Sequence, residues 1–214
     1  MKLFDYWRSS SAWRVRIALR WKAVAYEQVA VNLHPSGSQQ HTPAFRDINP
    51  AGQVPVLELD DGRRILQSMA ILEYLEEQFP TPPLLPGDPW LRARARQLAQ
   101  MVVAGIQPLN NLATLQHVKG ALGGDPDAWV RHFVGRGLAV LERMAGDTAG
   151  AFLVSDAPSF ADVTLVPQLY VARRYGVDLL AYPTLTGVEA RCAALPAFAA
   201  AHPDVQPDAP RSSP

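Results

Sequence analysis

Three consecutive serines near the start of the chain are the residues whose type and spacing most suggest chemistry. Ser9, Ser10 and Ser11 stand between a short apolar run and a helical pattern, directly after Arg8. Serines before a helix are usually caps, because a side-chain oxygen satisfies a free backbone N–H group. A functional role requires an anion at the helix start, where unpaired N–H groups and the helix dipole favour negative charge.

A serine hydrolase is the first alternative, since a serine hydroxyl can act as a nucleophile. Such a serine needs a general base with an orienting group behind it. The chain contains five histidines: His34, His41, His117, His132 and His202. Their spacing shows neither a base for the serines nor a metal site, and the single cysteine, Cys192, adds no ligand pair. We therefore expect neither a hydrolase nor a metal centre.

The composition excludes several broad classes of protein. The 214 residues are 48% apolar and 19% charged, as in globular proteins, and the formal charge is zero at pH 7. Proteins that bind nucleic acid usually carry a basic footprint, which this balance does not provide. No apolar run reaches the roughly 18 residues of a membrane span, and the first residues lack the layout of a signal peptide. We expect a cytoplasmic protein that binds neither nucleic acid nor membrane.

The first half of the chain alternates strand and helix patterns. Apolar and alternating runs predict strands at 3–7, 29–33, 54–59 and 64–66, the last two joined by a tight turn. Helical periodicity predicts helices at 13–22 and from Ser68 onward, with a short helix or turn at 42–47. The predicted order is β-α-β-α-β-β-α with a mixed sheet.

The second half has a different composition. Residues 80–89, PTPPLLPGDP, hold five prolines and are typical of an extended connector. Only helical patterns follow, at 90–119, 126–145, 159–175 and 184–194, and Ser159 to Asp162 resembles a capping box. The expected organisation is an α/β domain at 1–80, a linker at 81–89, an all-helical domain at 90–202 and a flexible tail at 203–214.

Pro55 stands at the start of the third predicted strand. A proline there lacks the N–H group that a sheet would use, and only about 5% of X–Pro bonds are cis. Within this order of elements, however, its place resembles the cis-proline of thioredoxin-like folds. In those folds the backbone of the preceding residue, here Val54, pairs with an extended thiol peptide.

The stretch SSSAWRVRIAL, from Ser9 to Leu19, resembles the signature of zeta-class glutathione transferases, which usually reads SSCSxRVRIAL. Further matches include Asn49-Pro50, Gln53-Val54-Pro55, Gln67-Ser68-Met69-Ala70-Ile71, Gly105 to Leu112, and Leu165-Val166-Pro167-Gln168. The resemblance runs from residue 1 to about 208. It implies the glutathione transferase fold, a homodimer, and a glutathione-dependent maleylacetoacetate isomerase of tyrosine and phenylalanine breakdown.

Ser11 departs from this signature, because many family members carry cysteine at its place. If the enzyme's own sulfur attacked the substrate, the change would abolish activity. If bound glutathione supplies the sulfur, the change is tolerable. A thiolate at a helix start is stabilised by N–H groups and the helix dipole, and hydroxyls can donate to the same sulfur. We therefore expect Ser9, Ser10 and Ser11 to act as donors in the catalytic site rather than as nucleophiles.

The resemblance also implies how the rest of glutathione is held. The Val54 backbone would pair with the cysteinyl part of the tripeptide. Gln67 and Ser68, at a helix start, would hold the γ-glutamyl carboxylate. Gln40 would reach the glycyl end, with Gln39 as the alternative.

Further residues are implied in the second domain and for the substrate. Gln107 and Asn111, four apart on one predicted helical face, would approach glutathione. Maleylacetoacetate is a dianion, and guanidinium groups suit carboxylates. The resemblance points to Arg8 and Arg174 as the substrate-binding pair, although Arg173 would replace Arg174 if the register differed by one. Arg14 and Arg16 are expected to point away or to form local ion pairs.

The implied reaction is a reversible addition. The thiolate adds to the cis double bond, the resulting single bond rotates, and elimination gives fumarylacetoacetate without consuming glutathione. Small α-halo acids are expected as side substrates for conjugation. Three alternatives stay open: a maleylpyruvate isomerase, a general detoxifying glutathione transferase, and a non-catalytic thioredoxin-like module. The presence of Ser9, Gln53-Val54-Pro55 and Gln67-Ser68 argues against the last.

Overall fold

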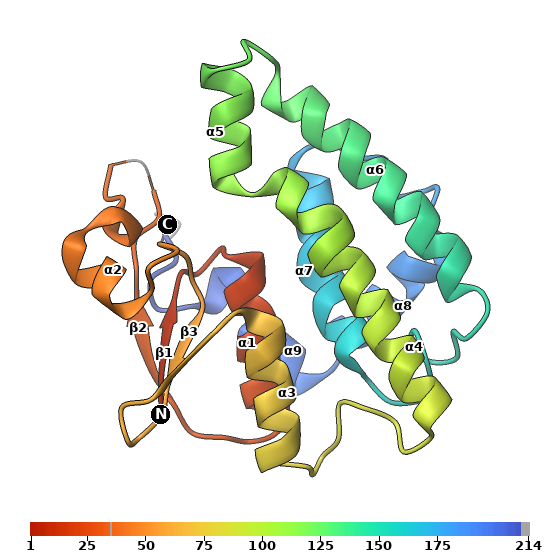
Figure 1. The fold of residues 1–214 in the computed structure, drawn as a ribbon. Coiled ribbons are helices and arrows are strands. Elements are labelled where there is room, and N and C mark those ends of the chain that lie inside the picture. Colours follow the sequence, from red (N-terminus) through yellow and green to blue (C-terminus); the bar gives the residue numbers. More distant parts are fainter. Residues whose placement is uncertain (35, 211–214) are drawn as a thin grey trace. The chain divides into compact units, whose positions relative to one another are not determined.

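The computed structural model describes residues 1–34 and 36–210, which form two units (Figure 1). The first unit comprises Met1–Pro83 together with the chain from Leu195 onward, and the second comprises Leu84–Ala194. Among the described helices, none combines the length and apolar character that crossing a membrane demands.

A four-stranded mixed sheet forms the frame of the first unit. Its strands are β1 (Lys2–Asp5), β2 (Glu27–Ala30), β3 (Val56–Glu58) and β4 (Arg64–Leu66), in the order β2-β1-β3-β4. β1 pairs with β2 in parallel, and the other two pairs are antiparallel. The predicted mixed sheet is confirmed. The second strand begins two residues before the predicted range, because Lys2 pairs with Glu27.

Helices cover both faces of this sheet. They are α1 (Ser10–Trp21), the 3₁₀ turn η1 (Gln39–His41), α2 (Pro43–Ile48) and α3 (Ser68–Gln78). α1 and α3 pack against each other. On the other face Phe4 meets Phe45 of α2 edge to face, with ring centroids 6.3 Å apart. Successive β1 side chains point to opposite faces, so Leu3 and Asp5 are buried away from Phe45.

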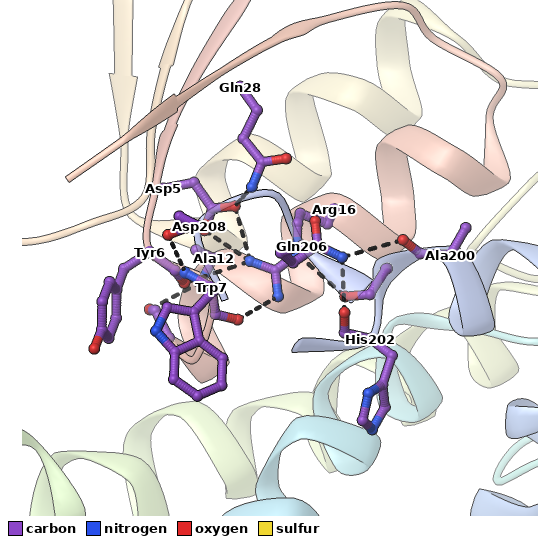
Figure 2. A network of polar contacts seen from close by, with 12 residues as sticks. Asp5, Tyr6, Trp7, Ala12, Arg16, Gln28, Ala200, His202, Gln206 and Asp208 are labelled. Carbon is purple, nitrogen blue, oxygen red and sulfur yellow. Dashed lines mark hydrogen bonds and ion pairs between the residues drawn. The ribbon is translucent and has the colours of Figure 1, made fainter. Parts of the chain in front are cut away.

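The buried charge on β1 is neutralised by an arginine of α1. Arg16 Nη1 lies 2.8 Å from both carboxylate oxygens of Asp5, and both side chains are fully buried. Gln28 Nε2 donates to the same carboxylate at 2.8 Å (Figure 2). Desolvation raises the pKa of Asp5, and the charge and hydrogen bonds of Arg16 oppose that rise. Arg16 thus forms one of the expected local ion pairs, but in the core rather than on the surface.

The C-terminal segment differs from the expectation. Residues 195–202, expected in the helical domain, belong to the first unit, where α9 (Pro196–Ala201) packs on α1. Residues 203–210, expected to be a flexible tail, begin with the 3₁₀ turn η4 (Pro203–Val205). They are held by side-chain bonds, since Gln206 Nε2 donates to the carbonyls of Ala200 and His202. Residues 211–214 of the expected tail lie outside the described residues.

The second unit is helical, as predicted. Its elements are α4 (Pro89–Gln100), the π-helix η2 (Met101–Ile106), the 3₁₀ turn η3 (Gln107–Asn110), α5 (Leu112–Gly120), α6 (Pro126–Ala145), α7 (Phe160–Arg174) and α8 (Pro183–Ala193). α7 has twelve of its fifteen residues buried and forms the centre of this unit. The predicted helices at 126–145, 159–175 and 184–194 agree with α6, α7 and α8 within one residue.

The single helix predicted at 90–119 is wrong. It divides into α4, η2, η3 and α5, and Asn111 between η3 and α5 is extended, with ψ 146°. Pro108 explains the interruption, because proline lacks an N–H donor and its ring clashes with the carbonyl four residues earlier.

The predicted capping box is present at the start of α7. Asp162 Oδ2 accepts the Ser159 N–H at 2.7 Å and the Ser159 hydroxyl at 2.8 Å. Asp162 Oδ1 accepts the Leu153 N–H at 2.9 Å. Desolvation raises the pKa of this fully buried carboxyl, and these hydrogen bonds oppose the rise. The aspartate therefore satisfies donors of both the helix and the preceding loop.

Arg16→Met is expected to lower the free energy of unfolding by about 3–5 kcal/mol, because it leaves the buried Asp5 carboxylate without its partner. Urea titration followed by circular dichroism measures the loss. The matched control is Arg20→Met on the same helix, where an exposed guanidinium lies over the Tyr26 ring and the loss should stay below about 1 kcal/mol. A loss of similar size in both variants would contradict the role given to the buried pair.

Candidate active site

The serine motif forms the start of α1. Ser9 is the N-cap residue, and its Oγ accepts the Ala12 N–H at 3.3 Å. Ser10 and Ser11 are the first two helical residues, and all three serines are partly exposed. The capping role of Ser9 is thus present, and a hydroxyl that accepts one hydrogen bond still has a proton to donate. The motif can act as a cap and as a donor site for an anion.

The loop before β3 presents the backbone of Val54. The Val54–Pro55 bond is cis, as its place in the fold predicted. Buried Asn49 holds this loop, because its Nδ2 donates to the Gln53 carbonyl at 2.7 Å and its Oδ1 accepts the Ala51 N–H at 3.0 Å. The Val54 side chain belongs to the same buried cluster as Ala12 of α1. The Val54 backbone therefore lies near the serine motif, and a role for Asn49 was missed by the sequence analysis.

The start of α3 is backed by a buried guanidinium. Gln67 is the N-cap residue with φ 69°, and Ser68 follows it as the first helical residue. Ser68 Oγ accepts a hydrogen bond from Arg14 Nη1 at 3.3 Å. Arg14 is 1% exposed, so it does not point away as expected. Desolvation lowers the pKa of Arg14 to about 9, which leaves it charged at neutral pH.

Arg14 could have been found from spacing. Residues four apart lie on one face of a helix, and Arg14 follows Ser10 by four positions in a helix that the pattern predicted. A buried arginine was not expected, because arginines are mostly exposed. Together, the helix starts of α1 and α3 and the charge of Arg14 form a site suited to an anion.

The two candidate glutamines on η1 have different surroundings. Gln39 Oε1 accepts the Asn32 N–H at 2.7 Å, so its side chain already stabilises the loop. Gln40 is 5% exposed, and its Oε1 has no hydrogen-bond partner among the described residues. Gly52 allows the close approach here, because it has φ +62° and a Cβ would lie 2.8 Å from the Gln40 carbonyl oxygen. Of these two glutamines, Gln40 is the one whose buried amide oxygen lacks a hydrogen-bond partner among the described residues.

Arg8 lies at a cavity within the first unit. The cavity has a volume of about 520 Å³ and is lined by Tyr6, Trp7, Arg8, Ala30, Asn32, His34, Gln39, Asp208 and Pro210. The Arg8 guanidinium lies over the Trp7 ring, 5.2 Å from its centroid, and is partly exposed. Within the described part of the chain it forms no ion pair, so its charge is open to an anionic ligand.

The second unit contains the other predicted residues. Gln107 is buried at the start of η3, whereas Asn111 is the extended N-cap residue of α5. The prediction that they share one helical face is therefore wrong, because Gln107 lies in a 3₁₀ turn and Asn111 is extended. Arg173 forms a two-pronged ion pair with Glu189. Arg174 is exposed and lies over the ring of Tyr175, and the charge of Arg173 is paired with that of Glu189.

The only thiol of the chain is not a nucleophile. Cys192 is buried in α8, and desolvation raises its pKa far above neutral pH. A buried thiol of this kind is inert, since reactive cysteines have lowered pKa values and some exposure. Any thiolate held at the serine motif must come from a bound ligand.

Comparisons with known proteins show which family the chain belongs to. Residues 3–83 match the N-terminal domain and residues 127–206 the C-terminal domain of glutathione S-transferase. The maleylacetoacetate isomerase of Pseudomonas aeruginosa is 46% identical over 213 residues, 98% of this chain and 99% of that protein. Both halves of a glutathione transferase are therefore present in one chain.

Similar solved structures indicate which class of glutathione transferase the chain resembles. The maleylacetoacetate isomerase of Anaeromyxobacter dehalogenans, with glutathione bound in its active site, is 53% identical with a TM-score of 0.90, covering 98% of this chain and 97% of that one. The same protein has been solved with dicarboxyethyl glutathione and citrate. A bacterial maleylpyruvate isomerase of zeta class is 40% identical with a TM-score of 0.94, covering 98% of this chain and all of that one. The chain belongs to the zeta-class glutathione transferases, the family of the maleylacetoacetate isomerases.

Proposed function

We propose that this protein catalyses the glutathione-dependent isomerisation of maleylacetoacetate to fumarylacetoacetate. The proposal depends on one observation: the site offers hydrogen-bond donors to an anion, while the chain's own thiol is buried elsewhere. The starts of α1 and α3 favour anions, while Cys192, the only cysteine, is buried and protonated. A relative with 46% identity over nearly the whole chain bears this activity in its name.

Glutathione would extend across the first unit. Its cysteinyl backbone would pair with Val54, whose N–H and C=O make no hydrogen bond to another described residue. Its γ-glutamyl carboxylate would meet Gln67 and Ser68. Because Ser68 Oγ accepts from Arg14, its own proton is available for a bond to the ligand. Gln40 would take the glycyl end, where its buried Oε1 needs a donor and could accept the glycyl N–H.

The serine motif would hold the glutathione sulfur as a thiolate. N–H groups of a first helical turn and the helix dipole stabilise a thiolate and lower the pKa of the thiol. Hydroxyls of Ser9, Ser10 and Ser11 would add charge-assisted hydrogen bonds. Ser11 in place of the family's cysteine is then compatible with activity, because the reacting sulfur belongs to glutathione.

The reaction would proceed by addition and elimination. The thiolate forms a C–S bond at one carbon of the cis double bond, and the electron pair moves to the conjugated carbonyl oxygen as an enolate. The former double bond rotates, the pair returns, and the C–S bond breaks to release the thiolate and the trans product. Arg8 and Arg174 would hold the carboxylates and stabilise the enolate charge. A dicarboxyethyl thioether of glutathione, as bound in the Anaeromyxobacter protein, has the expected kind of C–S bond.

A maleylpyruvate isomerase is the second candidate. The zeta-class maleylpyruvate isomerase matches this chain with a TM-score of 0.94. Its substrate is a shorter diacid with the same cis double bond, so the thiolate site and the two arginines would serve equally. A homodimer and a cytoplasmic location are implied only by the family resemblance, and both stay predictions.

Turnover of maleylacetoacetate and maleylpyruvate, each with and without glutathione, tests the proposal. We expect glutathione-dependent isomerisation, faster on the longer acid. Faster turnover of maleylpyruvate would select the second candidate, and tight glutathione binding without turnover of either acid would indicate a general transferase.

Ser9→Gly should lower kcat by about 10- to 100-fold through the lost charge-assisted bond, although glycine still caps the helix. Ser9→Thr, which keeps the hydroxyl, is the control.

Arg14→Met should raise the KM for glutathione by about tenfold, because Ser68 loses its donor and the γ-glutamyl carboxylate loses a nearby charge. Arg14→Lys keeps the charge and should recover part of the affinity. Isothermal titration with glutathione measures binding, and circular dichroism checks that both variants fold. If both bind as tightly as the wild type, the carboxylate is not held at the start of α3.

Arg8→Met and Arg174→Met should each raise the KM for the diacid by at least tenfold, the loss of one charge-assisted contact. The KM for glutathione should stay within twofold. Arg173→Met should leave the diacid KM unchanged, because the Arg173 side chain is bound to Glu189. An effect at Arg173 without one at Arg174 would reverse that assignment. Steady-state kinetics with either substrate varied separates these outcomes.

A further inference from the structure

Trp7, which directly precedes Arg8, is held through both its backbone N–H and its backbone carbonyl. The Trp7 N–H donates to Asp208 Oδ2 at 2.9 Å. The Trp7 carbonyl accepts from Arg16 Nη2 at 2.8 Å (Figure 2). The Tyr6 carbonyl accepts the Ser9 N–H at 2.8 Å, which continues the chain into the serine motif. The connection between β1 and α1 is therefore fixed on each side of Trp7.

The acceptor of one of these hydrogen bonds, Asp208, lies in the C-terminal segment. Asp208 is 201 residues from Trp7 in sequence, in the segment that was expected to be a flexible tail. Arg16 Nε donates to the Ala201 carbonyl at 3.1 Å, which ties this segment to α1. Gln206 adds its two bonds to the end of α9. Through these hydrogen bonds, which all lie within the first unit, the C-terminal segment holds the β1–α1 connection in place (Figure 2).

Asp208 occupies a costly position. Its Oδ2 takes the Trp7 N–H, but its Oδ1 is buried without a partner among the described residues. A buried unsatisfied acceptor costs free energy. Its charge also acts unfavourably on Asp5, whose pKa it helps to raise. Among the described residues, the only hydrogen bond that the Asp208 side chain makes is the one from the Trp7 N–H, so the reason for its position lies in that contact.

This contact lies at the cavity described above. Trp7, Arg8 and Asp208 all line it, and the Arg8 guanidinium rests over the Trp7 ring. Arg8 directly follows Trp7, so a rotation of the backbone at Trp7 would move both the ring and the guanidinium. A shift of about 1 Å in a substrate-positioning group can cost a large factor in rate.

We propose that Asp208 is a positioning residue for Arg8: by accepting the Trp7 N–H, the C-terminal segment sets where the guanidinium meets the anionic end of the substrate. This inference rests on the proposed function, in which Arg8 holds a substrate carboxylate. The required property is the position of an acceptor rather than a negative charge.

Four variants separate position from charge. Asp208→Ala removes the acceptor and should raise the diacid KM by about tenfold, with the glutathione KM within twofold. Asp208→Asn keeps an acceptor oxygen without the charge and should stay within threefold of the wild type. Asp208→Glu keeps the charge but displaces it, so its diacid KM should rise. Asp204→Ala, an exposed acid of the same segment, is the matched control and should change nothing.

Hydrogen exchange gives a readout independent of activity. The amide of Trp7 should exchange faster in the alanine and glutamate variants than in the wild type, and the asparagine variant should stay protected. Unchanged exchange or unchanged diacid KM in Asp208→Ala, while Arg8→Met shows its expected effect, would overturn this inference alone. An unchanged diacid KM in Arg8→Met would instead remove Arg8 from the proposed function, and this inference with it.

Discussion

The buried ion pair between Asp5 and Arg16 is the constraint on which the first unit depends. A carboxylate inside a sheet needs a counter-charge with good geometry, since desolvation of each ion costs several kcal/mol. Arg16 meets that need at 2.8 Å and uses its remaining N–H groups on the carbonyls of Trp7 and Ala201. One guanidinium thereby joins β1, α1 and the C-terminal segment, and fixes the connection that leads to the serine motif.

The chemistry of the site depends on where the reacting sulfur comes from. Its one thiol, Cys192, is buried and inert, so the protein contributes donors and charges while the ligand contributes the sulfur. Donors fixed in advance at a helix start need little reorganisation when charge develops, which is the largest source of catalysis in many enzymes. A serine at position 11 is compatible with such a site, because a hydroxyl serves as a donor even though it is a poor nucleophile.

Local signals in the sequence predicted most of the fold, and tertiary packing accounts for the failures. Alternation and turn residues gave the mixed sheet, and the spacing of Ser159 and Asp162 gave the capping box, because these depend on neighbours in the chain. The prediction of a single helix at 90–119 was wrong, because Pro108 interrupts the helix although the apolar periodicity continues past it. The burial of Arg14 and Arg16 was missed, because charged residues are usually exposed. The contact of Arg14 with Ser68 and that of the C-terminal segment with Trp7 were missed, because the partners lie far apart in sequence. The roles of the glutathione-site residues came from family resemblance and could not be obtained from spacing alone.

The two arginines of α1 show how one short sequence serves two tasks. Residues two apart on a helix point about 200° apart, so Arg14 and Arg16 lie on opposite sides of α1. Arg14 reaches Ser68 at the start of α3, and Arg16 reaches Asp5 and the β1–α1 connection. One arginine therefore contacts the start of α3, the proposed anchoring point of glutathione, and the other contacts the loop that carries Arg8. Both arginines belong to the helix whose first turn bears the serines. The proposed glutathione anchor, the proposed thiolate site and the loop that carries Arg8 are therefore all positioned by α1.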